Sequence, residues 1–291
     1  MADPIGLCTW IFGHQRHREI AALAAELGCE GVELHVPLDA WSAADIRHLY
    51  ASFGLRILSL TPENVDLAHP DIHEQQRAER YYSRLIAFAA ALEAPAVTIH
   101  EQVGRGAAPD TPQREGERLR GACQRLARLA EEWQVDLLLE PLRPPLVSQL
   151  HRAIDAVRLC EAVGSPRLRI VLDTFHMDAT ERDPGRAIAL CAGRLGAVQL
   201  ADRQRRGLGL GGLDLQPYWQ GFEAIGFRGP WLLECAVGLS GPCLQTQAVD
   251  IHQLRLALES SLMALRRHLA ARPPRSTAPG REVKSPSQPE A

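Results

Sequence analysis

Several features that would place the chain in a particular class of protein are missing from its 291 residues. No run of 18 apolar residues is present, so we expect no transmembrane helix and no membrane partner. The segment Met1–Ile5 lacks the basic-then-apolar profile of a secretory signal. The seven cysteines are scattered without a Cys-x-x-Cys pair, which is typical of reduced thiols in a protein core. Together these absences predict a cytoplasmic protein without a disulfide framework.

An excess of positive charge is also missing. Lysine and arginine total 32 against 35 aspartates and glutamates, which gives a formal net charge of -3. Domains that hold a polyanion by bulk charge carry a clear basic excess, so we expect no nucleic-acid partner. The first apolar run is followed by Thr9-Trp-Ile-Phe-Gly, which is not the glycine-rich loop that opens a dinucleotide-binding sheet.

What is present is a regular alternation of short apolar runs and longer amphipathic stretches. The amphipathic stretches carry apolar residues at three- and four-residue steps, which predicts helices. Continuous apolar runs between helices are typical of a parallel sheet that is covered on its faces. The predicted strands are Ile5–Trp10, Gly31–Val36, Leu55–Leu60, Ala96–His100, Val135–Glu140, Leu168–Asp173, Gly196–Ala201 and Trp231–Ala236. The predicted helices include Arg18–Leu27, Gln76–Leu92, Arg114–Trp133, Leu150–Ala162, Pro184–Cys191 and Asp250–Ala270.

Eight strand–helix units in this length predict an α/β fold, a single-domain (β/α)8 TIM barrel over residues 1–270. A doubly wound sheet is the competing architecture, and the missing glycine-rich loop argues against it. Residues 271–291 are rich in Pro, Ser and charge and have little to bury, which predicts a disordered C-terminal tail.

Polar side chains end four consecutive predicted strands, from the fifth to the eighth. Because the carboxyl ends of parallel barrel strands form one face, we expect these side chains to share the mouth of the barrel. One such residue alone could be a salt-bridge partner or a solvated loop residue, but four on one face indicate a site. The four residues are Glu140, Asp173, Gln199 and Glu234.

Three carboxylates that are buried close together raise one another's pKa values unless a cation compensates their charge. Two glutamates, one aspartate and one amide oxygen form an oxygen-rich set, which suits Mn²⁺ or Mg²⁺, with Co²⁺ and Zn²⁺ as alternatives. The sequence therefore predicts one divalent cation held by these four residues.

Four further residues are candidates for the wall of this cavity. His176 follows the sixth strand, where it could bind a substrate oxygen or act as a capping residue. His100 and Glu33 lie at or near the ends of the fourth and second strands, and each could equally be a satisfied structural group. Arg205 belongs to the glycine-rich run 202–212, whose arginines could grip a hydroxyl, carboxylate or phosphate, or lie in solvent.

These motifs resemble the xylose-isomerase-like TIM barrels, the sugar phosphate isomerase/epimerase group that includes tagatose/psicose 3-epimerases and hydroxypyruvate isomerase. The resemblance covers about residues 5 to 268. It implies that Glu140, Asp173, Gln199 and Glu234 hold one divalent metal and that His176 and Arg205 contact substrate. It is carried by Leu-Glu140-Pro-Leu, Leu-Asp173-Thr-Phe-His176-Met, Val-Gln199-Leu-Ala-Asp202 and Leu-Leu-Glu234.

The chain departs from the 3-epimerase pattern at two places. The 3-epimerases usually have a metal-binding His at the position of Gln199. The hydroxypyruvate isomerase branch has Gln there, as this chain does. After Glu140 the 3-epimerases continue with an Asn-Arg-Tyr-Glu-like segment, whereas this chain reads Arg143-Pro-Pro-Leu146 without a carboxylate. The Asp-x-His pair of the more distant endonuclease IV is absent after the seventh strand.

The resemblance implies a metal-dependent isomerase or epimerase of a keto sugar or a related small polyhydroxy carbonyl compound. Glu140 and Glu234 would be the catalytic pair, one removing a proton beside the carbonyl and the other delivering one through an enediolate. Two alternatives stay open: a dehydratase of a keto-cyclitol or dehydroshikimate-like substrate, and an inactive barrel that acts as a binding subunit. Assembly into a homo-oligomer is also left open.

Overall fold

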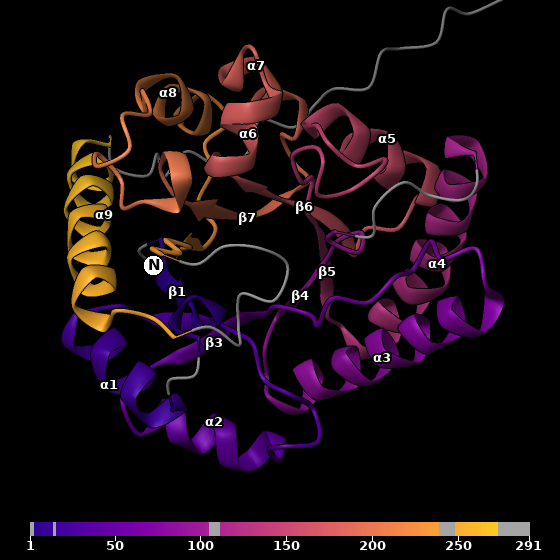
Figure 1. Cartoon of the computed structure of the whole chain (residues 1–291), viewed down its shortest axis with the longest axis horizontal. Coiled ribbons are helices and arrows are strands. Elements are labelled where there is room, and N and C mark those ends of the chain that lie inside the picture. Colours follow the sequence, from indigo (N-terminus) through magenta and orange to yellow (C-terminus); the bar gives the residue numbers. More distant parts are fainter. Residues whose placement is uncertain (1–2, 14–15, 105–110, 239–247, 273–291) are drawn as a thin grey trace, which may run out of the picture.

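The computed structural model describes residues 3–13, 16–104, 111–238 and 248–272. Eight parallel strands close into a barrel in the order β1 to β8, and the helices surround it as an outer ring (Figure 1). The predicted (β/α)8 barrel is confirmed. The strands are β1 (Ile5–Cys8), β2 (Gly31–Leu34), β3 (Arg56–Leu60), β4 (Ala96–Ile99), β5 (Asp136–Leu139), β6 (Leu168–Asp173), β7 (Leu195–Leu200) and β8 (Trp231–Leu233).

The outer helices reproduce the predicted stretches and add three that periodicity did not predict, α2, α6 and α8. Within the described ranges, no helix has the length and apolar character needed to cross a membrane. The helices are α1 (His17–Glu26), α2 (Ala43–Ala51), α3 (Ile72–Ala91), α4 (Pro112–Trp133), α5 (Ala153–Val163), α6 (Thr174–Thr180), α7 (Pro184–Leu190), α8 (Gln216–Ala224) and α9 (Ile251–Ala271), with short 3-10 helices η1 (Thr9–Phe12) and η2 (Arg203–Arg205).

Short polar side chains mark where several of these helices begin. Ser42, Asp71 and Thr111 each accept a hydrogen bond from a backbone N–H in the first turn of the helix that follows. Such caps satisfy donors that have no partner inside the helix. At its other end α5 stops at Gly164, whose φ of 75° is the left-handed conformation that glycine adopts without strain.

The core forms between the barrel and the helix ring and inside the barrel itself. Leu7, Leu137 and Leu233 are fully buried, as the continuous apolar runs predicted. The barrel is tightly closed at β2, where a Cβ on Gly31 would lie 2.4 Å from the carbonyl oxygen of Arg56. Six of the seven cysteines are buried free thiols, and Cys243 lies outside the described residues.

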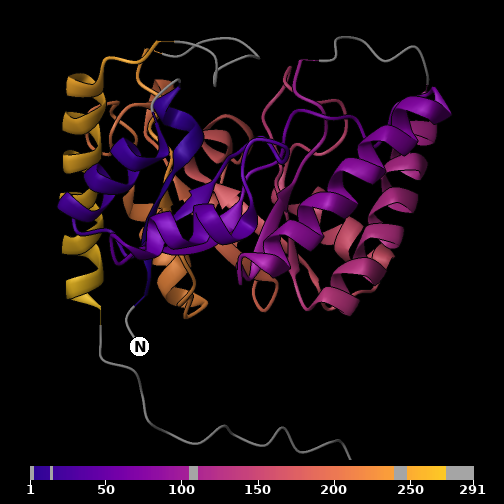
Figure 2. The same cartoon turned by 90° about the horizontal axis from the view of Figure 1, so that it is seen from below.

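The two ends of the barrel have different roles. Figure 2 shows the start of β1 and the end of α9 at the same end of the molecule. There the Arg272 guanidinium pairs with Asp3 at 2.6 Å and donates to the carbonyl oxygen of Phe227 at 2.8 Å. The opposite end is the mouth, where the strands terminate in polar residues. The tail predicted for residues 271–291 falls, beyond Arg272, outside the described part of the chain.

Candidate active site

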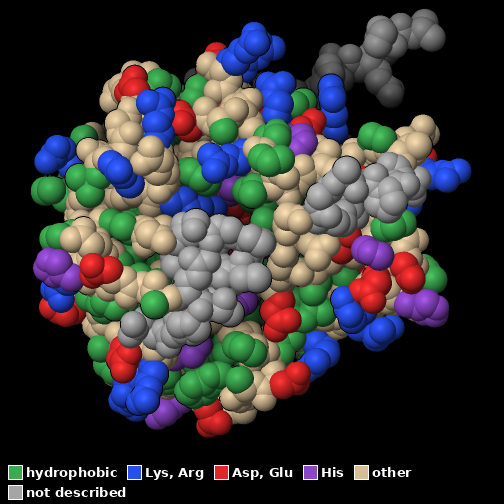
Figure 3. Space-filling view, in the orientation of Figure 1, with side chains coloured by type: hydrophobic (Ala, Val, Ile, Leu, Met, Phe, Trp, Pro, Cys, Tyr) green, Lys and Arg blue, Asp and Glu red, His purple; other side chains and the backbone are tan. Residues whose placement is uncertain are grey.

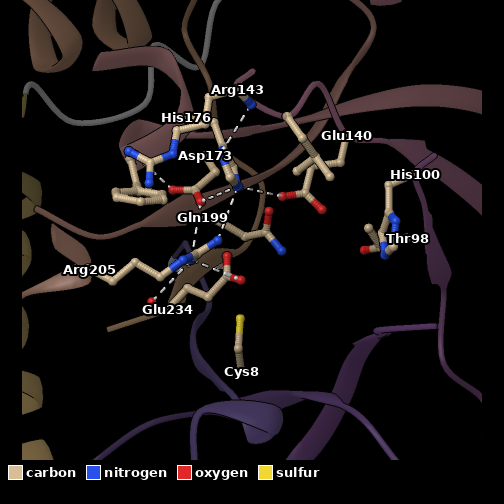
Figure 4. A network of polar contacts seen from close by, with 12 residues as sticks. Cys8, Thr98, His100, Glu140, Arg143, Asp173, His176, Gln199, Arg205 and Glu234 are labelled. Atoms are coloured by element: carbon tan, nitrogen blue, oxygen red, sulfur yellow. Dashed lines mark hydrogen bonds and ion pairs between the residues drawn. The ribbon is translucent and has the colours of Figure 1, made fainter. Parts of the chain in front are cut away.

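The structure brings seven of the eight candidate residues together at the mouth of the barrel, and His100 lies at the edge of the group. Figure 4 labels His100 and six of the seven, and the seventh, Glu33, joins the group through its hydrogen bond with Gln199. Arg205, whose side chain is 15% exposed, lies over the group. His100 is buried, and its Nδ1 contacts the carbonyl oxygen of Glu101 at 2.7 Å instead of a carboxylate of the site. The candidates that are 6% exposed or less are Glu33, Glu140, Asp173, His176, Gln199 and Glu234.

Backbone hydrogen bonds between neighbouring strands position the carboxylates at the ends of the strands. The backbone N–H of Glu140 donates to Ile99 at 3.0 Å, and that of Glu234 donates to Leu200 at 2.9 Å, so each side chain stands immediately beyond its strand. Asp173 is both the last residue of β6 and the N-cap of α6. Its Oδ1 accepts from the N–H of Phe175 at 2.9 Å, which leaves Oδ2 for the cavity.

A hydrogen bond from Gln199 to Glu33 fixes the orientation of the Gln199 amide. The carboxylate of Glu33 accepts from Gln199 Nε2 at 3.1 Å, from Thr98 Oγ1 at 2.7 Å and from Cys8 Sγ at 3.4 Å. Because Nε2 is held by Glu33, Oε1 of Gln199 is directed away from it. The cavity therefore receives an oxygen from the amide.

Three buried oxygens of this cavity have no hydrogen-bond partner among the residues that the structure describes: Asp173 Oδ2, Gln199 Oε1 and Glu234 Oε2. An unpaired buried acceptor costs about 1–3 kcal/mol, so such a set is stable only if something else compensates it. Glu140, Asp173 and His176 also offer ligand atoms within 4.8 Å of one another. These donors fit a divalent cation.

Arg205 supplies positive charge to the same acids. Its Nη1 lies 3.1 Å from Glu234 Oε1 and 3.4 Å from Asp173 Oδ2, and its Nη2 lies 3.0 Å from Nε2 of His176. The backbone that carries it is strained, since Gln204 and Arg205 have φ values of 58° and 54°. Residues other than glycine adopt this region at a cost, and consecutive examples are found where the surroundings hold them.

Asp202 holds the strained segment in place. Its buried carboxylate accepts backbone hydrogen bonds from Arg203 at 2.7 Å, Gly209 at 2.8 Å and Leu213 at 2.8 Å. One glycine of this loop has a packing role. A Cβ on Gly207 would lie 2.3 Å from the backbone oxygen of Ala257 in α9, so glycine here lets the loop pack against a helix.

Burial dominates the electrostatics of the site. It raises the pKa of Glu234 to about 8 and that of Asp173 to about 6, although Arg205 opposes both shifts. Burial, together with the charges of Glu234 and Asp173, raises the pKa of Glu140 well above its usual value. Burial and the nearby Arg205 lower the pKa of His176 well below its usual value, so its imidazole is neutral.

Several side chains that build the site carried no signal in the sequence. Trp10 in η1 donates its indole N–H to Glu234 Oε1 at 3.0 Å. Cys8 and Thr98 complete the shell of Glu33 from β1 and β4. Phe175 lies below two guanidinium groups, with its centroid 4.2 Å from Cζ of Arg143 and 4.5 Å from Cζ of Arg205.

Comparison with curated proteins finds relatives among the ketose 3-epimerases. The chain is 27% identical to the L-ribulose 3-epimerase of Mesorhizobium japonicum over 175 residues, 60% of this chain and 59% of that protein. It is 30% identical to the D-psicose 3-epimerase of Enterocloster bolteae over 123 residues, 42% of this chain and 41% of that one. These matches thus span less than two thirds of the length of either relative.

Solved structures share the fold over nearly their full length. A D-psicose 3-epimerase from Clostridium cellulolyticum H10, solved with D-tagatose, superimposes with a TM-score of 0.82 at 20% sequence identity, covering 91% of this chain and 99% of that one. At the level of sequence families, residues 21–251 match the family described as xylose isomerase-like TIM barrel. This match extends over most of the barrel, including all four strand ends of the site. The chain therefore belongs to the xylose isomerase-like TIM barrel family.

Proposed function

We propose that the protein is an epimerase or isomerase of a small polyhydroxy carbonyl compound, acting by proton transfer at a carbon next to the carbonyl. The observation that carries this proposal is the pair of buried glutamates, Glu140 and Glu234, which stand on different strands and both have raised pKa values. Pairs of carboxyl groups with tuned pKa values are suited to give and take protons near neutral pH. The ketose 3-epimerases among the relatives support the same reaction class.

The two glutamates would act on one substrate carbon from opposite sides. One carboxylate removes the proton beside the carbonyl, and the other, in its protonated form, delivers a proton to the enediolate. Delivery to the same carbon inverts its configuration, and delivery to the neighbouring carbon moves the carbonyl. Because burial raises the pKa values of both groups, a protonated carboxyl group is available to deliver the proton.

His176 and Arg205 would hold the substrate oxygens. The imidazole of His176 is neutral, and the guanidinium of Arg205 lies over Asp173 and Glu234 at the cavity entrance. Both groups can donate hydrogen bonds to a carbonyl or hydroxyl oxygen and fix its orientation. Glu33 acts from behind by holding the amide of Gln199, and His100 closes the wall next to Glu101.

A divalent cation fits this mechanism. Glu140, Asp173, Gln199 and Glu234 would hold it, and Mn²⁺ or Mg²⁺ suits their oxygen atoms, with Co²⁺ or Zn²⁺ as alternatives. When bound, the cation stabilises the negative charge that develops on the substrate oxygens.

Exchange with deuterated water tests the proposal directly. The purified protein with Mn²⁺ is incubated with a panel of ketoses, sugar phosphates and sugar acids in D2O, and products are identified by NMR. We expect deuterium at the carbon next to the carbonyl, together with an epimer or isomer of the same mass apart from the label. A product that has lost water would instead identify a lyase. Absence of exchange across the whole panel would contradict the proposal.

A further inference from the structure

Arg143 is a cation at the mouth of the site without a matching anion. It follows Glu140 by three residues, and Figure 4 places it beside His176 and Asp173. Among the described residues, its guanidinium forms neither an ion pair nor a hydrogen bond, and its contact is the ring of Phe175 at 4.2 Å from Cζ. The loop segment 141–150 contains no acidic residue that could neutralise it.

Hydrogen bonds fix the backbone of Arg143, whereas its guanidinium group has no ion pair with the described residues. The backbone N–H donates to Nδ1 of His176 at 3.3 Å, and the carbonyl oxygen accepts from Leu146 at 3.0 Å. The far end of the loop is fixed by the buried carboxylate of Glu101, which accepts from the N–H of Leu150 at 2.6 Å. A guanidinium on such a support loses little freedom when it binds a ligand.

A second guanidinium lies on the same ring. Cζ of Arg205 is 4.5 Å from the centroid of Phe175, but Arg205 already faces Asp173 and Glu234. Burial, and then the charge of Arg205, lowers the pKa of Arg143, and the charge of Asp173 opposes this shift.

Both arginine and acidic side chains lie on the surface around the entrance. Blue side chains border the centre of the mouth face in Figure 3. On the described surface this colour is arginine alone, because the one lysine of the chain, Lys284, lies outside the described residues. Arginine offers a planar fork of donors that matches the paired oxygens of a phosphate or carboxylate.

We propose that the substrate carries an anionic oxygen group, a phosphate ester or a carboxylate, and that Arg143 binds this group at the mouth. The inference rests on the proposed function for the reacting end of the substrate and adds the chemical class of its other end. The carbonyl compound is then a sugar phosphate or a sugar acid, in contrast to the neutral ketoses named for the relatives.

Calorimetric binding measurements in the presence of Mn²⁺ test this inference without requiring turnover. The ligands form matched sets: D-fructose and D-fructose 6-phosphate, D-ribulose and D-ribulose 5-phosphate, and 2-keto-D-gluconate for the carboxylate. We expect one anionic class to bind at least about 10-fold more tightly than its neutral counterpart, and added NaCl to weaken that binding alone. Preference for the phosphate esters or for the sugar acid identifies which group is recognised.

Two variants assign the preference to Arg143. Arg143→Gln should weaken binding of the preferred anion by about 10- to 100-fold and leave binding of the neutral sugar unchanged, since a charge-assisted hydrogen bond is lost. Arg206→Gln is the matched control: it removes the same charge from an exposed arginine on the same face, whose contact is the carbonyl oxygen of Leu210, and should change neither. Arg143→Lys should keep part of the preference.

The outcomes separate this inference from the proposed function. Equal affinity for neutral and anionic ligands, or equal weakening of both by Arg143→Gln, overturns the inference even if deuterium exchange occurs with a neutral ketose. Tight, Arg143-dependent anion binding without any exchange supports the inference and counts against the reaction. If Arg143→Gln does not fold, the salt dependence of the unmodified protein and the Lys variant still decide the matter.

Discussion

The amide nitrogen of Gln199 donates to Glu33 at 3.1 Å, and this one bond determines which end of the amide faces the cavity. Glu33 lies on β2 and Gln199 on β7, so the bond crosses the interior of the barrel. The amide oxygen is left buried without a hydrogen-bond partner among the described residues, next to oxygens of Asp173 and Glu234 that likewise accept no hydrogen bond there. Glu33, which lies behind the site, thus determines that Gln199 presents an oxygen and not a nitrogen to the cavity.

Replacement of Gln199 should therefore act on metal affinity. Gln199→Leu removes the proposed oxygen ligand, and we expect calorimetry to show Mn²⁺ affinity lowered by about 10- to 100-fold, the range for lost ligand support. Gln199→His should keep binding and shift the preference toward Zn²⁺ and Co²⁺, which favour imidazole. Gln75→Leu is the control, because Gln75 is an equally buried amide on α3 that donates to Leu67. Equal Mn²⁺ affinity in the Gln199→Leu and unmodified proteins would reduce Gln199 to a packing role.

The raised pKa values predict how the metal-free protein responds to pH. Glu234 has a pKa of about 8 and Asp173 of about 6 in the folded state, against ordinary values of 4.5 and 3.8. Between these limits the folded protein binds more protons than the unfolded chain, so its free energy of unfolding falls as pH rises from about 4 to about 8. Thermal unfolding in EDTA across this range should show the decline.

Added Mn²⁺ should reverse the trend, because it competes with protons for the same oxygens. The rise in melting temperature on addition of Mn²⁺ should therefore grow from pH 5 to pH 8. Glu234→Gln should lessen the decline between pH 6 and 8, since one of the groups with a raised pKa is gone. A metal-free stability that is flat over this range would contradict the burial of ionisable carboxyl groups at the mouth.

Removing either proposed acid–base group should affect turnover more than folding. Glu140→Gln and Glu234→Gln keep the shape and one oxygen but lose proton transfer, and each should lower kcat by about 10²–10⁴-fold. The two losses should not add, because both groups serve one proton-transfer sequence. One of the variants should still exchange substrate hydrogen with D2O without completing the reaction. Glu132→Gln, on the exposed face of α4, is the matched control, and near-native turnover of both site variants would exclude the two-glutamate mechanism.

Trp10 should tune the basicity of Glu234. Its indole N–H hydrogen-bonds to the carboxylate at 3.0 Å and thereby stabilises the ionised form. Trp10→Phe keeps an aromatic ring and loses the donor, so the pKa of Glu234 should rise further. We expect the basic end of the metal-free stability decline, and the corresponding limb of the pH profile of kcat/KM, to move to higher pH. Trp133→Phe, an exposed tryptophan at the end of α4, should move neither.

The local pattern of the sequence was enough to predict the barrel and to locate the residues at its strand ends. Eight apolar runs separated by amphipathic helices admit few architectures, and a parallel barrel gathers the residues after its strands at one face. Glu140 and Glu234 could be located in this way because each follows its strand directly. The helices were predicted less completely than the strands, since short α2 and α8 contain too few turns for a clear periodicity.

The supporting contacts could not be predicted because they join distant parts of the chain. Trp10 and Glu234 are 224 residues apart, and nothing in the sequence near either residue indicates their contact. Only one of the two roles of Asp173 could be predicted. Its place at the end of β6 was recognised, but not that it also caps the helix that carries His176. Gly207 likewise packs against a distant segment, the backbone of Ala257 in α9.

The ion pair between Asp3 and Arg272 fastens the two ends of the described barrel to each other on the side away from the mouth. Because the first and last described segments meet in this way, a circular permutant can be made. A short linker across the ion pair and new termini in an exposed loop would leave all eight strands in register. Fusion partners, affinity labels or surface anchors attached near this seam would leave substrate access unobstructed. The barrel is thus suited to immobilisation with every entrance pointing away from the support.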